Sequence, residues 1–197
     1  GLFAMEKLRE FVSTTADSIA QMNKASKHLG ISAEALQELH YAADKSGVSF
    51  DALSDALKEI QVRAVDASSG QGEAAEAFSK LGLKSTDAAD RIREPLELLG
   101  AVADGMRAIP HQKQLWVADA IFGDEGSTII NMLRDGSAGL NQMRLEAKSL
   151  GYVMGGEAVA NGERLSRAFN RLSSNTQIAG RSIVERLFVP LAKVSEL

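Results

Sequence analysis

Gly30-Ile31-Ser32-Ala33-Glu34-Ala35-Leu36 is a complete helix-to-helix junction, and Gly47-Val48-Ser49-Phe50-Asp51-Ala52-Leu53 repeats it seventeen residues later. In each copy the glycine can adopt the left-handed conformation that closes a helix. The serine can then accept a hydrogen bond from a free backbone N–H of the next helix, and the acid favours the positive end of the helix dipole. The apolar residues before the serine and four residues after it occupy the two positions of a hydrophobic staple. The repeat therefore predicts short helices joined by stiff turns.

Upstream of the first junction, apolar or small residues recur at steps of three and four, which places them on one face of a helix. We expect an amphipathic helix over residues 1–29, carried by Leu8, Phe11, Thr15, Ile19, Met22 and Leu29.

Two weaker signals follow the second junction. The segment Leu81–Ala88 looks like a third copy with an extra residue before Ser85 and with Lys84 at the staple position, so it predicts a helix cap without a staple. The cluster Ala67–Gly72 predicts a flexible helix break. A phosphate-binding loop is excluded at that cluster, because no strand precedes it and its glycines are too closely spaced.

Further along, proline and glycine divide the chain into more short helices. We expect, in order, a helix from Pro95 to about Arg107, an extended break at Ile109-Pro110, a helix from His111 to Phe122, a turn at Gly123–Gly126, a short helix through Ile129, Ile130 and Leu133, a stop at Asp135-Gly136, and a helix capped by Ser137 that runs to about Leu150. The predicted fold is all-α: an N-terminal amphipathic helix over 1–29, a bundle of short helices joined by Gly/Ser-capped turns over 30–151, and a long C-terminal amphipathic helix over 152–197.

The C-terminal section has a different pattern. Beyond Gly155-Gly156, apolar positions from Leu165 to Val194 keep a spacing of three or four, interrupted late by Pro190, which predicts a long helix that packs on a partner. From Glu163 onward six basic residues oppose three acidic ones, so this end carries +3 and the rest of the chain −7. This difference in charge is explained either by a basic helix face that is exposed to water or by docking of this end on an acidic surface.

Composition excludes several classes of protein. The chain has 197 residues, of which 45% are apolar and 24% charged, and this balance predicts a folded core. It has no cysteine, which excludes disulfide scaffolds, zinc fingers and thiol chemistry and fits assembly in a reducing compartment. A net charge of −4 makes nucleic acid an unexpected partner. The longest apolar stretches, such as Leu98–Ala103, are too short to span a bilayer. No signal peptide is recognised, and the absence of an initial Met is expected of a fragment.

Residues able to do chemistry are present, but their spacing does not match a known site. His28, His40 and His111 lack metal-ligand spacing. The Gly136–Gly139 stretch does not have the spacing of a nucleophile elbow around Ser137. We expect the adjacent acids Asp124 and Glu125 to be solvent-exposed, and Trp116 and Tyr41 to be packing anchors in the core. The sequence therefore predicts no catalytic, cofactor-binding or metal-binding residue, no cofactor, and no enzyme activity.

Taken in order and at their intervals, these signals resemble the tail tape measure proteins of long-tailed bacteriophages and prophages. The likeness covers roughly residues 29–151. One departure is the stretch Ile130-Asn131-Met132, where family members often carry a proline, and it is expected to lengthen that helix. The likeness is carried by Leu29–Leu36, Leu39, Tyr41–Ala43, Gly47–Ser49, Gly72–Phe78, Leu81–Leu83, Ala120–Gly123, Gly126, Ile130, Leu133, Gly136, Gly139-Leu140, Glu146-Ala147 and Leu150-Gly151.

The resemblance implies a structural role in the virion tail. Such proteins set tail length and scaffold the tail tube, and they leave ahead of DNA during ejection. The implied partners are other copies of the chain, tail tube subunits, tail assembly chaperones and, during ejection, the host membrane. The implied locations are the tube lumen and, during assembly, the host cytoplasm. Two alternatives stay open: a membrane-active module that uses residues 165–194, and a fragment of a tail-associated cell-wall-degrading enzyme.

A ruler made of helix measures about 1.5 Å per residue. The predicted bundle would have to open in order to lie in a narrow tube, because its stops interrupt a continuous rod. Those stops are Gly30, Gly47, Gly82, Pro110, Gly123 and Gly136.

Overall fold

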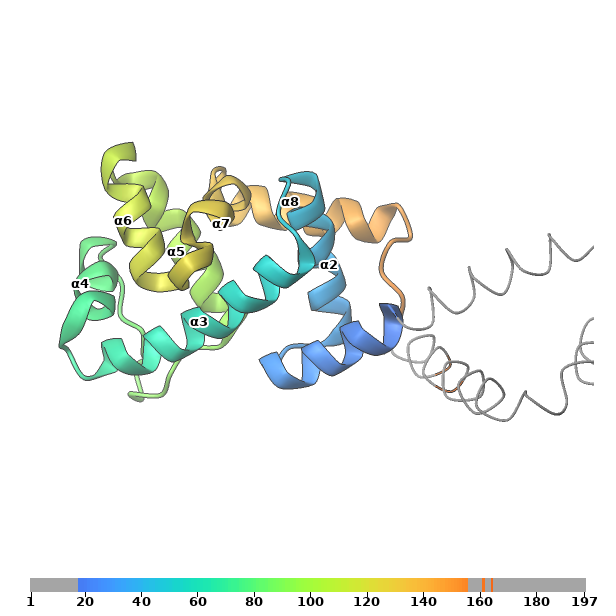
Figure 1. The fold of residues 1–197 in the computed structure, drawn as a ribbon, viewed down its shortest axis with the longest axis horizontal. Coiled ribbons are helices and arrows are strands. Elements are labelled where there is room, and N and C mark those ends of the chain that lie inside the picture. The colour runs from blue at the N-terminus through green and yellow to red at the C-terminus, as the bar shows by residue number, and fades with distance from the viewer. Residues whose placement is uncertain (1–17, 156–160, 162–163, 165–197) are drawn as a thin grey trace, which may run out of the picture. The chain divides into compact units, whose positions relative to one another are not determined.

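The computed structural model describes residues 18–155, 161 and 164. The chain divides into two compact units, one formed by Gly1–Gln21 with Glu157–Leu197 and the other by Met22–Gly156. Nearly all the described residues belong to the second unit, whose regular secondary structure is helical (Figure 1). Within the described part of the chain there is no strand, only an isolated β-bridge. The all-α prediction is confirmed.

None of the helices in the described residues combines the length and the apolar character needed to cross a bilayer.

Both copies of the repeated junction form as predicted. Ser32 is the N-cap of α2 (Ala33–Lys45), and Ser49 is the N-cap of α3 (Phe50–Ser68). Each serine side chain accepts a hydrogen bond from the backbone N–H three residues further on, at 3.0 and 3.1 Å. The caps satisfy donors that a helix cannot satisfy internally, which explains why the helices begin at these residues.

The glycines and the staple positions of the junctions also behave as expected. Gly30 and Gly47 have φ angles of 68° and 75°, in the left-handed region that closes a helix. The four staple residues all belong to the core or pack against it. The junctions therefore join helices that share one core. The staple residues are Ile31, Leu36, Val48 and Leu53.

The third predicted cap is wrong. After α4 (Gly72–Lys80), residues 83–94 form a loop in which Thr86 pairs with Ile92 in an antiparallel bridge. No helix starts at Ser85, which is buried. Asp87 gives the physical reason, because its carboxylate binds backbone N–H groups of residues 89 and 91 and closes a turn there.

The remaining boundaries follow proline and glycine closely. Ile109 and Pro110 are extended, with ψ angles of 151° and 142°, and they separate two helices as predicted. The predicted turn after Phe122 is a single turn of 3₁₀ helix. The elements are α5 (Pro95–Ala108), α6 (His111–Phe122), η1 (Gly123–Glu125), α7 (Gly126–Leu133) and α8 (Gly136–Ser149).

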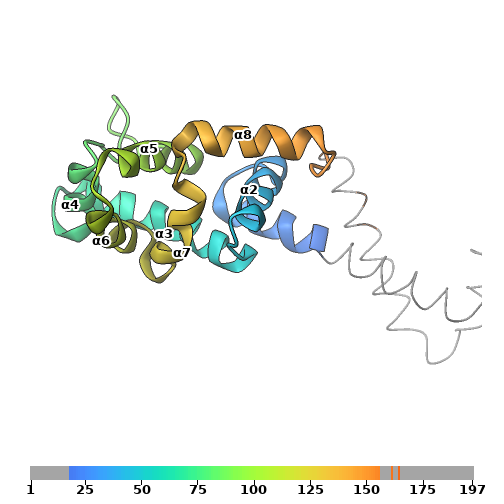
Figure 2. The ribbon, with the colours of Figure 1, turned by 90° about the horizontal axis from the view of Figure 1, so that it is seen from above.

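Helix α3 runs through the unit and contacts α2, α4, α5, α6 and α7 (Figure 1). Helices α5 and α8 pack together along one side, as the rotated view shows (Figure 2). A single apolar cluster lies between these helices and excludes water from their facing sides. Its largest fully buried side chains are Phe122, Leu36, Leu39, Leu53, Leu57, Ile60, Leu98, Leu99, Ile121, Ile129, Met132 and Leu133.

The predicted flanking helices fall mostly outside the described residues. Residues 18–29 are helical, and the remainder of the helix predicted over 1–29 lies outside the description. At the other end, residues 152–155 are not helical. The apolar seam predicted from Leu165 to Val194 lies outside the described residues altogether.

Candidate functional site

The histidines singled out in the sequence do not form a site. His28 and His111 are exposed. His40 is half-buried, with its Nε2 atom 3.3 Å from Oδ1 of Asp44 in the next turn of α2. Within the part of the chain that the structure describes, no group of three or more His, Asp or Glu side chains could hold a metal ion.

Ser137 is not a helix cap, contrary to the sequence prediction. Helix α8 begins one residue earlier, at Gly136, and its N-cap residue Asp135 makes no side-chain capping bond. The cap comes instead from α5, where Oδ1 of Asp104 accepts a hydrogen bond from the Ser137 backbone N–H at 2.8 Å. A Cβ atom on Gly136 would lie 2.6 Å from that carboxylate oxygen, so the close approach requires glycine.

The two aromatic residues expected in the core differ from one another. Trp116 is 36% exposed, and the Lys80 ammonium lies 5.4 Å from its ring centroid, so the core prediction is wrong for this residue. Tyr41 is half-buried and donates its hydroxyl to Glu146 Oε1 at 2.9 Å. Of the adjacent acids, Asp124 is exposed as expected, and Glu125 is half-buried.

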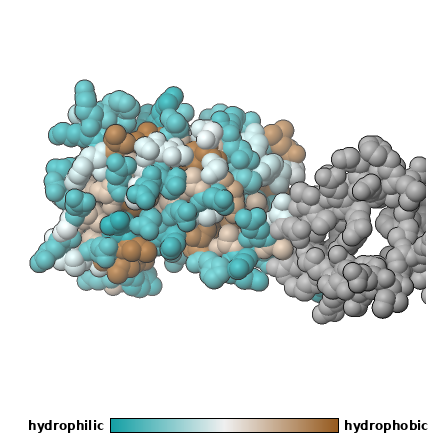
Figure 3. Space-filling view, in the orientation of Figure 1, coloured by the Kyte–Doolittle hydropathy of each residue, from teal (hydrophilic) through white to brown (hydrophobic). Residues whose placement is uncertain are grey.

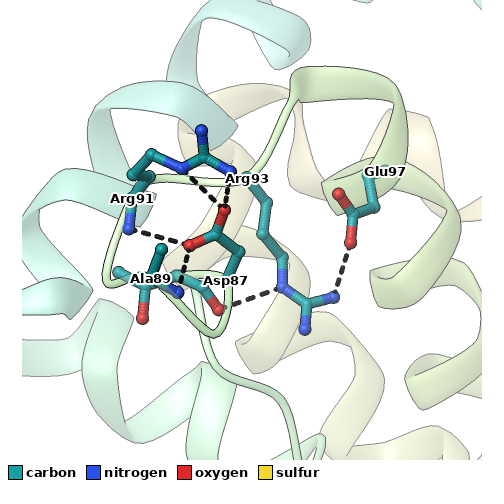
Figure 4. A network of polar contacts seen from close by, with 6 residues as sticks. Asp87, Ala89, Arg91, Arg93 and Glu97 are labelled. Carbon is teal, nitrogen blue, oxygen red and sulfur yellow. Dashed lines mark hydrogen bonds and ion pairs between the residues drawn. The ribbon is translucent and has the colours of Figure 1, made fainter.

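A compact polar network holds the loop between α4 and α5 (Figure 4). The Asp87 carboxylate accepts from the backbone N–H groups of Ala89 and Arg91, at 2.8 and 3.0 Å, and from the Arg91 guanidinium at 2.9 Å. Arg93 donates to the Thr86 carbonyl and to Glu97. The hydrogen bond from the Arg91 backbone is the main reason that the pKa of Asp87 is lowered. Every charge in this network is satisfied internally, which indicates a structural role.

A second set of polar contacts joins α2 to α8. The Glu38 side chain is only 4% exposed, and its carboxyl group lies between two cationic side chains. Arg144 Nε lies 2.7 Å from one of its carboxylate oxygens, and Lys148 Nζ lies 3.0 Å from the other. Burying a carboxylate is unfavourable unless its charge is paired, so the ion pairs with Arg144 and Lys148 hold α8 against α2.

Further along α2, Tyr41 and Lys45 bind an acid that belongs to α8. The Glu146 carboxylate accepts from the Tyr41 hydroxyl and forms an ion pair with Lys45. The hydrogen bond from Lys45, followed by that from Tyr41, lowers the pKa of Glu146. The same acid raises the pKa of the Tyr41 hydroxyl.

The residues that follow α8 are also fixed to α2. Gln37, 2% exposed, donates to the Met154 carbonyl at 3.0 Å and accepts from the Met154 N–H at 2.8 Å. Tyr152 stacks edge-on against Tyr41 and places its hydroxyl 3.3 Å from Asp44. We call residues 151–154 the strap.

We call the contacts of α2 with α8 and the strap the α2–α8 clasp. Its partners are separated by 101 to 117 residues in the sequence. Nothing in the local pattern marks them, because Glu38 and Gln37 look like ordinary polar positions of an amphipathic helix. The residues of the clasp are Gln37, Glu38, His40, Tyr41, Asp44, Lys45, Arg144, Glu146, Lys148, Tyr152 and Met154.

Two shallow grooves are present in the described unit. One, of about 330 Å³, lies beside α8 and is lined by Leu39, Leu99 and Leu140 together with Asp104 and Arg144. The other, of about 810 Å³, lies between the end of α3, α4 and the loop after it. Of the charged groups that line the first groove, Asp104 and Arg144 hold α8, and Glu97 is paired with Arg93. The geometry therefore favours a packing surface over a catalytic centre.

The face of the described residues seen in Figure 3 is mainly hydrophilic, with small apolar groups set among polar side chains. The most exposed large apolar side chains lie on or just beyond α8, where Leu145 and Leu150 are 65% and 66% exposed. Isolated exposed apolar residues of this kind are normal for folded proteins.

A family model described as phage-related minor tail protein matches residues 4–123, which are 120 of the 197 residues. No curated protein and no solved structure matches the chain. The α2 half of the clasp lies inside the matched range, and the α8 half lies beyond it.

Proposed function

The chain belongs to the phage-related minor tail protein family, and from this we propose that it is a segment of a tape measure protein, which sets tail length while the tube assembles around it. The observation that carries the proposal is the family match over residues 4–123, taken with a helical unit whose described residues contain no strand. We propose the tail tube lumen as its place in the virion. Its proposed partners are other copies of the chain, tube subunits and assembly chaperones.

A ruler converts chain length into distance, and the described unit can do so only if it opens. The unit contains the 135 residues from 22 to 156. As one continuous helix these residues would extend about 200 Å, at about 1.5 Å per residue. A globular domain is stabilised by only about 5 to 15 kcal/mol, an amount that contacts with a surrounding protein wall can offset. We therefore propose that the unit is compact before assembly and extended in the finished tail.

Tail length tests the ruler role directly. Residues 22–156 are removed in frame from the gene that encodes the chain, and tails are measured by electron microscopy. We expect tails shorter by about 200 Å. The matched control replaces the same residues with an unrelated helical segment of equal length, which should restore the original length. Tails of unchanged length after the deletion would exclude a measuring role for this segment.

Cross-linking tests the opening. These 197 residues contain no cysteine, so Lys45→Cys and Glu146→Cys introduce the only two thiols within them, on side chains that pair in the compact unit. A short bismaleimide should join them within one chain in the isolated protein and fail to do so in assembled tails. The control pair is Glu76→Cys with Lys80→Cys, one turn apart in α4, which stays close in any helical state. Efficient joining of residues 45 and 146 in intact tails would show that the bundle persists there.

A further inference from the structure

Helix α8 is held differently from the other helices. It has 14 residues, as α5 has, but it buries only Gly136, Leu140 and Ala147, whereas α5 buries seven residues. Apolar burial is the main stabilising contribution to helix packing in water. Helix α8 therefore depends on polar contacts for much of its attachment.

Those contacts come from two helices and act on α8 from end to end. Asp104 of α5 binds the first turn, Glu38 of α2 binds Arg144 and Lys148, and the Gln37 amide binds the strap. Each of these polar groups has a hydrogen-bond or ion-pair partner when α8 is docked. Each regains water when α8 leaves, so the net cost of separation is small compared with the cost of exposing the apolar cluster.

We propose that α8 and the strap form a latch, which undocks from α2 and α5 as one piece while α3, α5, α6 and α7 stay folded. The Arg134–Gly136 connection is the hinge, because α7 is anchored by Ile129, Met132 and Leu133 in the apolar cluster. Undocking uncovers Leu39 and Leu99, which line the groove beside α8. The chain leaves this unit through the strap, so tension on residues beyond 155 reaches the latch before it reaches the core.

Native-state hydrogen exchange on the 197-residue chain tests the latch. The backbone amides of α8 should open at least tenfold more often than those between Leu53 and Ile60 in α3. Glu38→Gln removes the charge that binds Arg144 and Lys148, and should raise the opening of α8 at least tenfold further with α3 unchanged. The matched control is Glu76→Gln, which breaks the exposed Glu76–Lys80 pair in α4 and should alter neither helix.

A second variant keeps the test decisive if Glu38→Gln fails to fold. Lys148→Gln removes only the more exposed partner of Glu38 and should raise the opening of α8 several-fold, again with α3 unchanged. Equal protection of α8 and α3, with both falling together in either variant, would overturn the latch. That outcome would leave the measuring role untouched, because tail length tests the role separately.

Discussion

The Asp104 carboxylate of α5 accepts a hydrogen bond from the backbone N–H of Ser137, at 2.8 Å, and so caps a helix that begins 32 residues later in the chain. A helix start is usually capped by the residue that precedes it. Here Asp135 occupies that place without making a capping bond. The start of α8 therefore depends on the correct packing of α5, which couples local structure to the tertiary fold.

Asp104→Ala should destabilise the chain by about 1 kcal/mol, the usual cost of losing a cap. The loss should be concentrated in the first turn of α8, where amide exchange should accelerate. Asp135→Ala is the matched control, since this side chain makes no capping bond, and it should change the unfolding midpoint little. A larger loss of stability in Asp135→Ala than in Asp104→Ala would show that Asp135, and not Asp104, caps α8.

Ser32→Ala and Ser49→Ala should each lower the free energy of unfolding by about 1 kcal/mol, because each leaves a backbone N–H of the first turn without its acceptor. Urea denaturation followed by circular dichroism measures the change. Ser68→Ala serves for comparison, because this exposed serine bonds only to a carbonyl in its own helix. A cap variant no less stable than Ser68→Ala would contradict the prediction.

Gly126→Ala should be strongly destabilising. A Cβ atom there would lie 2.5 Å from the backbone of Ala118 and Asp119, where α7 crosses α6. Overpacking of this kind costs about 1 to 3 kcal/mol, and a backbone neighbour cannot move aside easily. Gly100→Ala is the contrasting variant, because its Cβ would meet Ser137 at an ordinary 3.6 Å. It should stabilise α5 by about 0.5 to 1 kcal/mol, so the two alanine variants should shift the thermal midpoint in opposite directions.

Acid should destabilise the chain below about pH 4. Hydrogen bonds from Ser137 lower the pKa of Asp104, and those from Lys45 and Tyr41 lower the pKa of Glu146. In the unfolded chain these carboxyl groups titrate near 4, so the unfolded state takes up protons first as the pH falls. The stability they contribute is complete above that pH and is lost as the pH falls through their lower folded pKa values.

Thermal unfolding between pH 2 and pH 7 measures this acid dependence. Glu146→Gln should reduce the slope of the acid limb, because the variant has no proton to take up at that position. Glu76→Gln should leave the slope close to that of the original chain, since no comparable network surrounds that exposed side chain. An unchanged slope in Glu146→Gln would show that this carboxylate does not govern acid unfolding.

The order of the helices and most of their boundaries follow from the sequence alone. Ser32 and Ser49 bond to residues three positions away, and Pro95 and Pro110 act on their own backbone. Interactions of such short range form within a few neighbouring residues and do not depend on how distant parts of the chain pack. Patterns of this kind therefore predict the all-α class and the limits of α2, α3, α5 and α6.

Only the tertiary structure decided which helices meet and which polar residues join them. Glu38 binds Arg144 and Gln37 binds Met154 across more than 100 residues, a pairing that depends on how helices α2 to α8 fold back on one another. The same dependence on tertiary packing explains why the helix caps predicted at Ser85 and Ser137 are wrong. The Ser137 backbone N–H binds Asp104 of another helix, and Asp87 closes the turn after Ser85. In both places the backbone donor bonds to the acceptor that the folded chain brings close to it, and this acceptor is not the serine that the sequence pattern indicates.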